Sequence, residues 1–408
     1  MTSPTRAVLE RIYRLAPRGA LLGLERVQAA CATWGHPEQR FSAVHIAGTN
    51  GKGSVAAMTE SIVRASGRRT GLYTSPHLAR FAERIQIDGE PVSDELLTAT
   101  LEEALDRFPE LTFFETATVT AFSIFARANV DLAIVEVGLG GRLDATNVLK
   151  APLVTAITRI ALDHTDWLGP DLTSIAREKA GILKRGVTAV LGPLDPESRA
   201  EIEICAARVG APLRPTADDA RLAAFVAAHP PGLAGRHQAD NAKIAVALAE
   251  ELEISPGAIA RGLAAARWPG RLETLSTQSG EVLLDAAHNP DGALALAEAL
   301  ATRGRDRTEV ALVFGAMADK DAVAMLDLLA PHAAHRIYVV PEGRRATDPA
   351  TLAARAPGHI AASVPDALSR ARSGVGPRGL VVVAGSIFLV GAARAELLGL
   401  VRDPVVAL

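Results

Sequence analysis

Short apolar runs alternate with helix-like stretches along the whole chain, and no other feature of the sequence restricts the fold as strongly. Each apolar run is rich in leucine or β-branched residues and is too short for a stable helix, which is typical of a buried strand. The runs span residues 42–47, 132–137, 153–158, 188–191, 282–285, 310–314, 337–340 and 380–384. Alanine-rich stretches such as 242–252 and 292–300 lie between them. The alternation predicts an α/β fold with parallel sheets and crossover helices.

The chain is long enough for more than one domain. Its 408 residues correspond to two or three domains of roughly 150 residues each. The best boundary is Trp268-Pro269-Gly270, where proline and glycine interrupt the chain and a new strand–helix alternation begins. We therefore predict domains at 1–268 and 271–408, with a ligand site in the cleft between them.

Charge and cysteine content exclude several classes of protein. The chain carries 43 basic and 46 acidic residues, a net charge of −3, and only 4% aromatic residues, so we expect no nucleic-acid partner. Its two cysteines, Cys31 and Cys205, have no CxxC spacing, which argues against a disulfide framework and a zinc finger. Such cysteine usage fits a reduced, cytoplasmic setting.

The sequence also lacks the pattern of a signal peptide or a membrane helix. Charges are scattered through the first 15 residues, which have no apolar core. The longest uncharged stretch, 379–393, contains three glycines and is shorter than the ~20 residues of a membrane helix. We interpret it as a buried strand, a turn and the start of a helix, and expect no membrane partner.

The strongest local motif is a glycine-rich turn between a strand and a helix, AVHIAGTNGKGS at residues 43–54. Glycines let backbone N–H groups surround phosphate oxygens, and a helix N-terminus adds partial positive charge. Lys52 would reach the terminal phosphates, and the Ser54 hydroxyl would bind Mg²⁺. The loop departs from GxxxxGK[ST], because Ile46 replaces the first glycine and Gly53 separates the lysine from the serine. The alternative is an ordinary strand–turn–helix with a surface lysine.

One carboxylate, Glu136, ends an otherwise apolar strand. Burial of an unpaired carboxylate is costly, and a bound cation would offset that cost. Because ligands of open α/β sheets gather at the carboxyl ends of strands, we expect Glu136 to bind Mg²⁺ beside Ser54. The alternative partner of Glu136 is an arginine such as Arg142. The loop at 138–147 is dense in glycine and polar residues, a composition found more often in functional loops.

Two more residues draw attention by their positions. His164 follows the strand predicted at 153–158 and could bind a second metal, although a lone histidine is more often structural or solvated. Lys179 lies in a helix expected to begin after Asp171 or Thr173 as N-cap. A lysine there is ordinarily exposed or half of an ion pair.

Nine motifs follow one another in an order typical of one family: AGTNGKGS, TSPHLARFAERI, EVGLGGRLDATN, DHTDWLG, IAREKAGI, GRHQADNA, PGR, DAAHNP and AGSIFLVG. With these motifs, from about His45 to Gly391, the chain resembles folylpolyglutamate synthase/dihydrofolate synthase of the Mur ligase superfamily. The resemblance implies a P-loop ATPase domain with a mostly parallel sheet at 1–268. It also implies a smaller, Rossmann-like ligase domain at 271–408, with the active site between the two.

The resemblance implies roles in nucleotide and metal binding. The ATP phosphates would be bound by the loop of Gly48, Thr49, Asn50, Gly51, Lys52, Gly53 and Ser54. Ser54 and Glu136 would hold a first Mg²⁺, and Glu136 and His164 a second. Asn241 would lie near the adenine, while Arg271 and Asp285 would grip the nucleotide across the hinge. Taken alone, Asn241 could be a helix N-cap, and Arg271 could bind the last carbonyls of a helix.

The resemblance also implies residues for catalysis and substrate binding. Lys179 resembles the family lysine that becomes carbamylated and supports the metal region, and Asp144 matches an aspartate of the catalytic region. His288 and Ser386 resemble residues needed for activity, although taken alone they could cap a turn and a helix. The folate-contacting loop would include Ser75 and His77.

The chain departs from the family pattern at Ala286. The family commonly has DGAHNP, and here alanine replaces that glycine. Alanine lacks glycine's freedom at positive φ, so we expect a slight shift of the backbone without loss of a functional side chain.

The implied reaction joins a carboxylate to the amine of L-glutamate. The γ-phosphoryl of ATP converts the carboxylate into an acyl phosphate, and the amine then displaces phosphate to give an amide and ADP. His288 is a candidate to accept the proton of the amine. Dihydropteroate or a reduced folate would be the acceptor, and the protein would be a monomer. The choice of acceptor and a need for a monovalent cation stay open.

Two other functions compete with this one. A Mur-type ligase for a UDP-linked cell-wall precursor would carry a whole nucleotide-sugar domain before the loop, and only 47 residues precede Gly48. A non-catalytic ATP-binding regulator on the same fold would be favoured by loss of Lys52, Glu136 or His164. All three are present.

Overall fold

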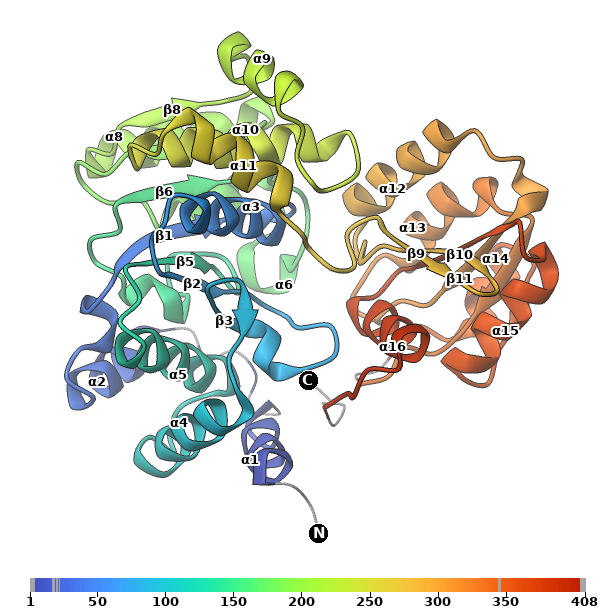
Figure 1. The fold of residues 1–408 in the computed structure, drawn as a ribbon, viewed down its shortest axis with the longest axis horizontal. Coiled ribbons are helices and arrows are strands. Elements are labelled where there is room, and N and C mark those ends of the chain that lie inside the picture. Colours follow the sequence, from blue (N-terminus) through green and yellow to red (C-terminus); the bar gives the residue numbers. More distant parts are fainter. Residues whose placement is uncertain (1–3, 17–18, 20, 22, 344–345, 404–408) are drawn as a thin grey trace. The chain divides into compact units, whose positions relative to one another are not determined.

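The computed structural model describes residues 4–16, 19, 21, 23–343 and 346–403, which form two units (Figure 1). The first contains the chain up to Pro76, Phe81–Leu233 and His237–Arg267. The second contains His77–Arg80, Ala234–Arg236 and the chain from Trp268 onward. The predicted division at 268–271 lies close to the last crossing, whereas the two short segments of the second unit were not expected.

The first unit is built on an eight-stranded sheet. Its strands, in spatial order, are β4 (Glu90–Pro91), β3 (Ile85–Ile87), β2 (Thr70–Tyr73), β5 (Leu132–Glu136), β1 (Ser42–Ala47), β6 (Val154–Ile157), β7 (Ala189–Leu191) and β8 (Leu213–Pro215). The strands from β2 to β8 in this order are parallel, and β3 and β4 are antiparallel to their neighbours. The predicted α/β class is therefore confirmed.

Helices cover both faces of this sheet (Figure 1). One face carries α3 (Lys52–Ala65), α10 (His237–Glu251) and α11 (Pro256–Ala265), and the other carries α4 (Asp94–Arg107) and α5 (Phe113–Arg127). The remaining helices are α1 (Pro4–Tyr13), α2 (Glu25–Thr33), α6 (Thr165–Leu168), α7 (Leu172–Ala180), α8 (Pro196–Val209) and α9 (Ala220–Ala228). The described residues of this unit also form the short 3₁₀ turns η2 (Pro37–Gln39), η3 (Phe81–Arg84) and η4 (Ala145–Val148).

The second unit is built on a six-stranded sheet. Its strands, in spatial order, are β13 (His359–Ile360), β12 (His335–Tyr338), β11 (Val310–Phe314), β14 (Leu380–Ala384), β10 (Gly280–Leu284) and β9 (Glu273–Thr277). Only β9 is antiparallel to its neighbour. The helices are α12 (Pro290–Arg303), α13 (Ala322–Leu329), α14 (Pro349–Arg355), α15 (Val364–Val375) and α16 (Ile387–Leu398), with 3₁₀ turns η5 (Arg307–Glu309) and η6 (Ala330–His332).

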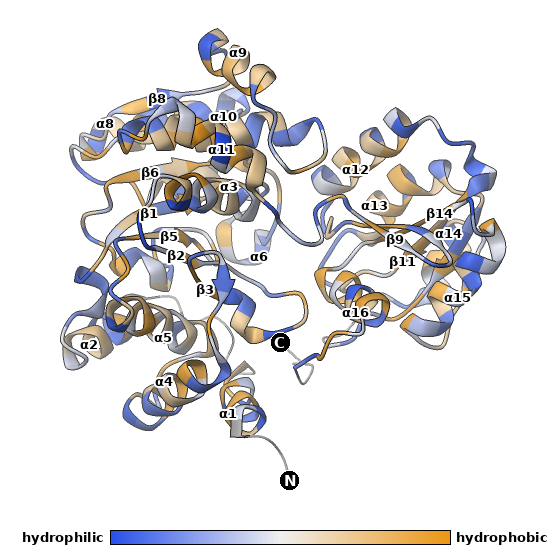
Figure 2. Ribbon diagram, in the orientation of Figure 1, coloured by the Kyte–Doolittle hydropathy of each residue, from blue (hydrophilic) through white to orange (hydrophobic). Residues whose placement is uncertain are grey.

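Alternate residues of the central strands divide the core of the second unit into two clusters. Leu312 and Val382 pack with α12, α13 and Leu352 of α14 on one face of the sheet. Their neighbours Val313 and Val383 pack with α15 and α16 on the other face. Both faces are thus buried, which explains why these strands read as continuous apolar runs. Figure 2 shows the resulting hydrophobic colouring along the central strands.

The long uncharged stretch at 379–393 forms β14, a turn at Gly385 and the first half of α16, as predicted. In the described part of the chain, no helix combines the length and apolarity needed to cross a bilayer.

Parallel strands bring the predicted site residues of each unit to one edge of its sheet. In the first unit, β2, β5, β1 and β6 end side by side and lead into Ser75, Glu136, the loop at 48–51 and the loop that carries His164. In the second unit, β10 and β14 end side by side and lead into Asp285 and Ser386. The carboxyl edge of an open α/β sheet is the usual place for a ligand.

Candidate active site

The predicted phosphate loop connects β1 to α3. The helix begins at Lys52, and Gly51 is its N-cap with φ of 89°, in the left-handed region. The N–H groups of residues 52–54, in the first turn, have no carbonyl partner within the helix. The loop therefore combines unpaired N–H groups, the positive end of a helix and a lysine, which together suit an anion such as phosphate.

The chain that follows β6 holds this loop in place. The N–H of Thr49 donates to the carbonyl of Arg159 at 2.7 Å, and its hydroxyl donates to the carbonyl of Ala161 at 3.1 Å. The Thr158 hydroxyl donates to the carbonyl of Asn50 at 2.7 Å. Thr49, predicted to belong to the phosphate site, therefore uses its N–H and hydroxyl to fix the loop.

Two glycines of the loop are required by close neighbours. A Cβ on Gly48, whose φ is 150°, would lie 1.8 Å from the Thr158 hydroxyl oxygen. A Cβ on Gly51 would lie 2.5 Å from the side-chain oxygen of Asn241. Both distances are far below van der Waals contact, so any other residue would displace the loop from its supports.

Glu136 is 5% exposed and faces the phosphate loop. Its Oε1 lies 3.9 Å from Lys52 Nζ, and its Oε2 accepts a hydrogen bond from the N–H of Ser75 at 3.1 Å. Arg142, considered from the sequence as a partner, instead forms an ion pair with Glu178 at 2.9 Å. The alternative Glu136–Arg142 pairing is therefore wrong, and the carboxylate is directed to the loop.

Ser54 is linked to the start of α10 by Gln238, a residue that the sequence analysis did not single out. Gln238 Nε2 donates to Ser54 Oγ at 3.2 Å, and Gln238 Oε1 accepts from Asn241 Nδ2 at 2.9 Å. All three side chains are buried. Asn241 lies inside α10, so it is not a helix N-cap, and its amide packs on Gly51 of the phosphate loop.

Lys179 lies on α7 with only 4% of its surface exposed, so the surface-lysine interpretation is wrong. Its Nζ donates to the carbonyl of Gly48 at 2.8 Å. Burial, together with repulsion from Lys52, lowers the pKa of Lys179 to about 7. A substantial fraction of this amine is therefore neutral near neutral pH. The helix begins after Asp171 as N-cap, one of the two positions expected.

Asp144 organises the loop that follows β5. Its Oδ2 accepts from the N–H of Leu139 at 2.8 Å, and its Oδ1 accepts from the N–H and the hydroxyl of Thr146 at 3.0 and 2.5 Å. Burial raises the pKa of Asp144, and these hydrogen bonds oppose that shift. The carboxylate is thus engaged by its own loop.

His164, the predicted ligand of a second metal ion, is exposed and has φ of 52°, in the left-handed region. Its Nε2 lies 3.9 Å from Asp163 Oδ1. Within the described ranges, no three His, Cys, Asp or Glu side chains come together as metal ligands. Ser54 and Glu136 carry hydroxyl and carboxylate oxygens, the type of ligand that a hard cation such as Mg²⁺ takes.

In the second unit, Asp285 secures the turn that contains Arg271. Its Oδ2 accepts from the N–H of Leu272 at 2.9 Å, and its Oδ1 accepts from the N–H of Ala287 at 2.9 Å. Arg271 is partly exposed and has no hydrogen bond or ion pair to any described residue, so it does not bind helix carbonyls here. Its guanidinium is therefore available to a ligand.

Ala286 fits the backbone that it occupies. Its φ is not positive, and its N–H donates to the carbonyl of Gly270 at 2.8 Å. The backbone shift expected from replacing the family glycine is therefore not required, because this conformation is open to alanine.

His288 and Ser386 both stabilise turns. His288 Nδ1 lies 2.9 Å from the carbonyl oxygen of Ala286, to which its N–H donates a hydrogen bond. Ser386 is 1% exposed and is the N-cap of α16, accepting from the N–H of Phe388 at 3.2 Å. The capping roles considered from the sequence are thus present.

Ser75 and His77 lie on either side of a crossing between the units. Ser75 follows β2 in the first unit, where its N–H is bonded to Glu136. His77 begins a short segment of the second unit, in which Leu78 packs against the core and the carbonyl of Ala79 accepts from the N–H of Asp403 at 3.0 Å. The predicted folate-contacting loop therefore belongs to both units.

Known proteins resemble this chain in sequence and in fold. The family model "Mur ligase, glutamate ligase domain" matches residues 270–387. Folylpolyglutamate synthase of Lacticaseibacillus casei is 36% identical in a match that covers 97% of this chain and 98% of the relative. The chain belongs to the folylpolyglutamate synthase/dihydrofolate synthase family.

Solved structures of this family have the same fold. Escherichia coli FolC in complex with DHPP and ADP matches with a TM-score of 0.87 and 33% identity, over 98% of both chains. A bifunctional folylpolyglutamate synthase/dihydrofolate synthase with Mn, AMPPNP and L-glutamate bound matches with a TM-score of 0.85 and 34% identity, over 97% of this chain and 98% of that one. The family resemblance predicted from the nine motifs is confirmed.

Two residues that support the predicted phosphate loop escaped the sequence analysis although signals for them existed. Thr158 places a hydroxyl at the end of an apolar run, and that hydroxyl supports the phosphate loop. Gln238 precedes Asn241 by three residues, which puts both on one helix face.

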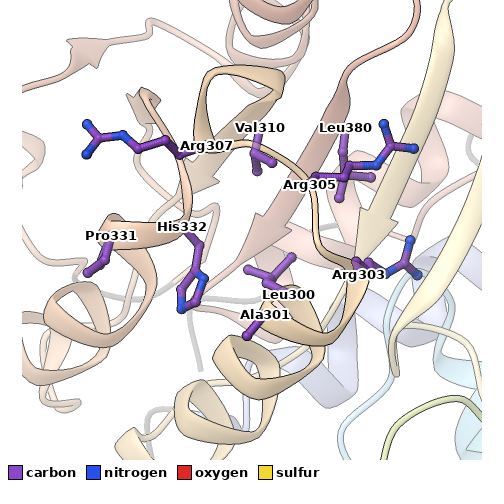
Figure 3. Close-up of a pocket in the computed structure, with 9 residues that line it drawn as sticks. All are labelled: Leu300, Ala301, Arg303, Arg305, Arg307, Val310, Pro331, His332 and Leu380. Atoms are coloured by element: carbon purple, nitrogen blue, oxygen red, sulfur yellow. The ribbon is translucent and has the colours of Figure 1, made fainter.

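A cavity of about 130 Å³ in the second unit lies away from the ligand edge expected for a Mur-type ligase. It is lined by Leu300, Ala301, Arg303, Arg305, Arg307, Val310, Pro331, His332 and Leu380. Val310 and Leu380 begin β11 and β14, so the cavity lies at the amino ends of strands. Arg307 points to the side opposite Arg303 and Arg305, so the three guanidinium groups do not converge on one anion (Figure 3).

Proposed function

We propose that this chain ligates L-glutamate to dihydropteroate, to reduced folates or to both, with ATP as the energy source and an acyl phosphate as intermediate. The observation that carries the proposal is the buried Glu136 carboxylate beside Lys52 of the phosphate loop. Family members are solved with ADP and DHPP, and with AMPPNP and L-glutamate. Their ligands are those that this reaction requires.

The loop residues 48–54 would bind the phosphates, with the N–H groups of the first turn of α3 as donors. Ser54 and Glu136 would hold a Mg²⁺ ion, which when bound neutralises charge on the phosphates. A family structure contains Mn, which supports a divalent ion here. Glu136 and His164 would hold a second ion.

The second unit would supply residues for the nucleotide and for ligation. Arg271, in the turn secured by Asp285, would contact the nucleotide. His288 would assist loss of the proton from the glutamate amine, and Ser386 would place the reacting groups at the ends of β10 and β14. In the first unit, Asn241 would lie near the adenine of ATP. The segment that contains Ser75 and His77 would contact the folate.

Lys179 would be carbamylated. Carbamylation requires a neutral amine, and burial lowers the pKa of Lys179 to about 7, which supplies that form. We expect Lys179→Ala to lose most of its activity and added bicarbonate not to restore it. Turnover at the wild-type rate by this variant would contradict the proposal.

The deciding assay is phosphate release with ATP, Mg²⁺ and L-glutamate, with dihydropteroate and tetrahydrofolate offered separately. Release with both would establish a bifunctional enzyme, and release with one would identify its acceptor. Lys52→Ala serves as the inactive control, because it removes the positively charged ammonium group that would contact the phosphates of ATP. No release with either acceptor, in protein that still binds ATP, would overturn the proposal. A cytoplasmic location, a monomeric state and a monovalent cation remain predictions.

A further inference from the structure

A chain of buried hydrogen bonds leads from the middle of β1 to the loop after β5. His45 is fully buried, and its Nε2 lies 2.8 Å from the hydroxyl oxygen of Thr146. That hydroxyl lies 2.5 Å from Asp144 Oδ1, and Asp144 Oδ2 accepts from the N–H of Leu139. This series of hydrogen bonds therefore joins strand β1 to Leu139, three residues after Glu136.

Counting the available protons shows which group donates in each of these hydrogen bonds. Asp144 already accepts two backbone N–H groups, from Leu139 and Thr146, as expected for a carboxylate. The single hydroxyl proton of Thr146 is then used in the hydrogen bond to Asp144, so the Thr146 oxygen must accept a hydrogen bond from His45 Nε2–H. His45 is therefore the Nε2–H tautomer.

The other ring nitrogen supports this direction. His45 Nδ1 is buried and has no hydrogen-bond partner in the described part of the chain. An unpaired buried N–H donor is rarer in proteins than an unpaired acceptor, so Nδ1 carries no proton. Burial, with repulsion from Lys184, also lowers the pKa of His45 to about 3, which keeps the ring neutral.

The loop that this chain fixes also supports the site around Glu136 and Lys179. A Cβ on Gly141 would lie 2.9 Å from the carbonyl oxygen of Lys179, so the loop packs directly on α7. The N–H of Arg142 donates to the carbonyl of Glu178 at 2.8 Å. A shift of Asp144 would therefore move the segments that carry both residues.

We infer that His45 is a positioning residue: as the Nε2–H tautomer it orients Thr146 and Asp144, and so fixes the 138–141 loop between Glu136 and Lys179. Its effect on turnover rests on the proposed function, whereas the tautomer and the order of the loop do not.

The tautomer is measured directly by ¹⁵N NMR of the histidine rings in the full chain, with His45→Gln used to assign the signal. We expect a protonated Nε2 and an unprotonated Nδ1. A protonated Nδ1 would overturn the inference, because Thr146 would then donate to His45 and the chain would run in the opposite direction. This measurement requires no activity.

The loop is tested with two matched pairs, Thr146→Val against Thr146→Ser, and His45→Leu against His45→Gln. Valine and leucine cannot continue the hydrogen bonds, whereas serine and glutamine can. We expect Thr146→Val and His45→Leu to speed amide hydrogen exchange at Leu139 and to lower kcat by roughly 10²-fold, with a change of less than threefold in the KM for ATP. The serine and glutamine variants should retain most of kcat and of the exchange protection.

Equal loss within each pair would show that packing alone matters and would overturn the inference. If the wild-type chain forms no product, the proposed function fails, while the exchange rates and the tautomer still decide the role of His45. If Thr146→Val does not fold, the wild-type tautomer and the serine variant decide it.

Discussion

Lys179 shows how position alters a side chain whose sequence context suggests nothing unusual. It follows two charged residues on α7, Arg177 and Glu178, yet the amine is buried against the carbonyl of Gly48, a residue 131 positions earlier in the chain. By contrast, the special position of Glu136 was predictable, because a single carboxylate in an apolar strand is a local signal. The supports at Thr158 and Gln238 were not predicted, since each depends on a partner that is distant in sequence.

The lowered pKa of Lys179 predicts a pH-dependent contribution to stability. Between pH 7 and 10.5 the unfolded chain binds more protons at this lysine than the folded chain does. The free energy of unfolding of the wild type should therefore rise with pH in this window relative to that of Lys179→Met. The relative gain is at most about 5 kcal/mol, at 1.36 kcal/mol per pKa unit. Urea unfolding in bicarbonate-free buffer measures it, and parallel curves for the two proteins would contradict it.

At the scale of elements, central strands were easier to predict than edge strands. Buried parallel strands such as β11 and β14 are continuous apolar runs, and their predicted bounds match the structure. The strands β4, β8, β9 and β13 lie at sheet edges, are two to five residues long and include polar or exposed positions, so their sequences carry little strand signal. Their pairing depends on a neighbour that the sequence does not identify.

Thr158, the residue after β6, supports the phosphate loop through its hydroxyl, so this hydroxyl should affect nucleotide binding. Thr158→Val keeps the shape of the side chain but loses the hydrogen bond to the carbonyl of Asn50. We expect the Kd for ADP to rise about tenfold, from a loss near 1.4 kcal/mol. Calorimetric titration measures it. Thr155→Val, at a buried threonine within β6, is the control and should leave the Kd unchanged. Equal Kd values for all three proteins would contradict the prediction.

The N-terminus of α5 should contribute measurably to stability. Thr112 and Glu115 form a capping box, and Glu115 also pairs with Arg26 at 2.8 Å. Thr112→Ala should lower the free energy of unfolding by about 1–2 kcal/mol, because a buried backbone N–H loses its acceptor. Urea unfolding with Ser93→Ala as comparison tests this, since Ser93 caps α4 with a bond of the same 3.3 Å length but at an exposed position, whereas Thr112 is buried. A larger loss in Ser93→Ala would contradict it.

At the scale of the whole molecule, each unit has its own sheet and its own buried clusters. The boundary near 268 could be predicted from the sequence because consecutive proline and glycine residues mark it. The short segments His77–Arg80 and Ala234–Arg236 were not, because their membership of the second unit depends on packing with residues far along the chain.

Separate cores predict separate responses to a core mutation. Leu312 is 1% exposed in the sheet of the second unit, and Leu312→Ala should cost about 2–5 kcal/mol. We expect calorimetry to resolve two unfolding transitions, of which this substitution lowers one. Val44→Ala, in β1 of the first unit, should lower the other. A single transition that both substitutions shift equally would show that the units unfold together.

The repeated crossing of the chain restricts how such a ligase can be recombined. A hybrid that exchanged only the part after Arg267 would keep the native 77–80 and 234–236 segments, which pack with the exchanged part. Leu78 packs directly on Gly391: a Cβ added to Gly391 would lie 2.0 Å from the carbonyl oxygen of Leu78. In the hybrid, Leu78 would contact the residue of another protein at this position. The second unit is therefore inherited as three pieces, and a single breakpoint cannot transfer it whole.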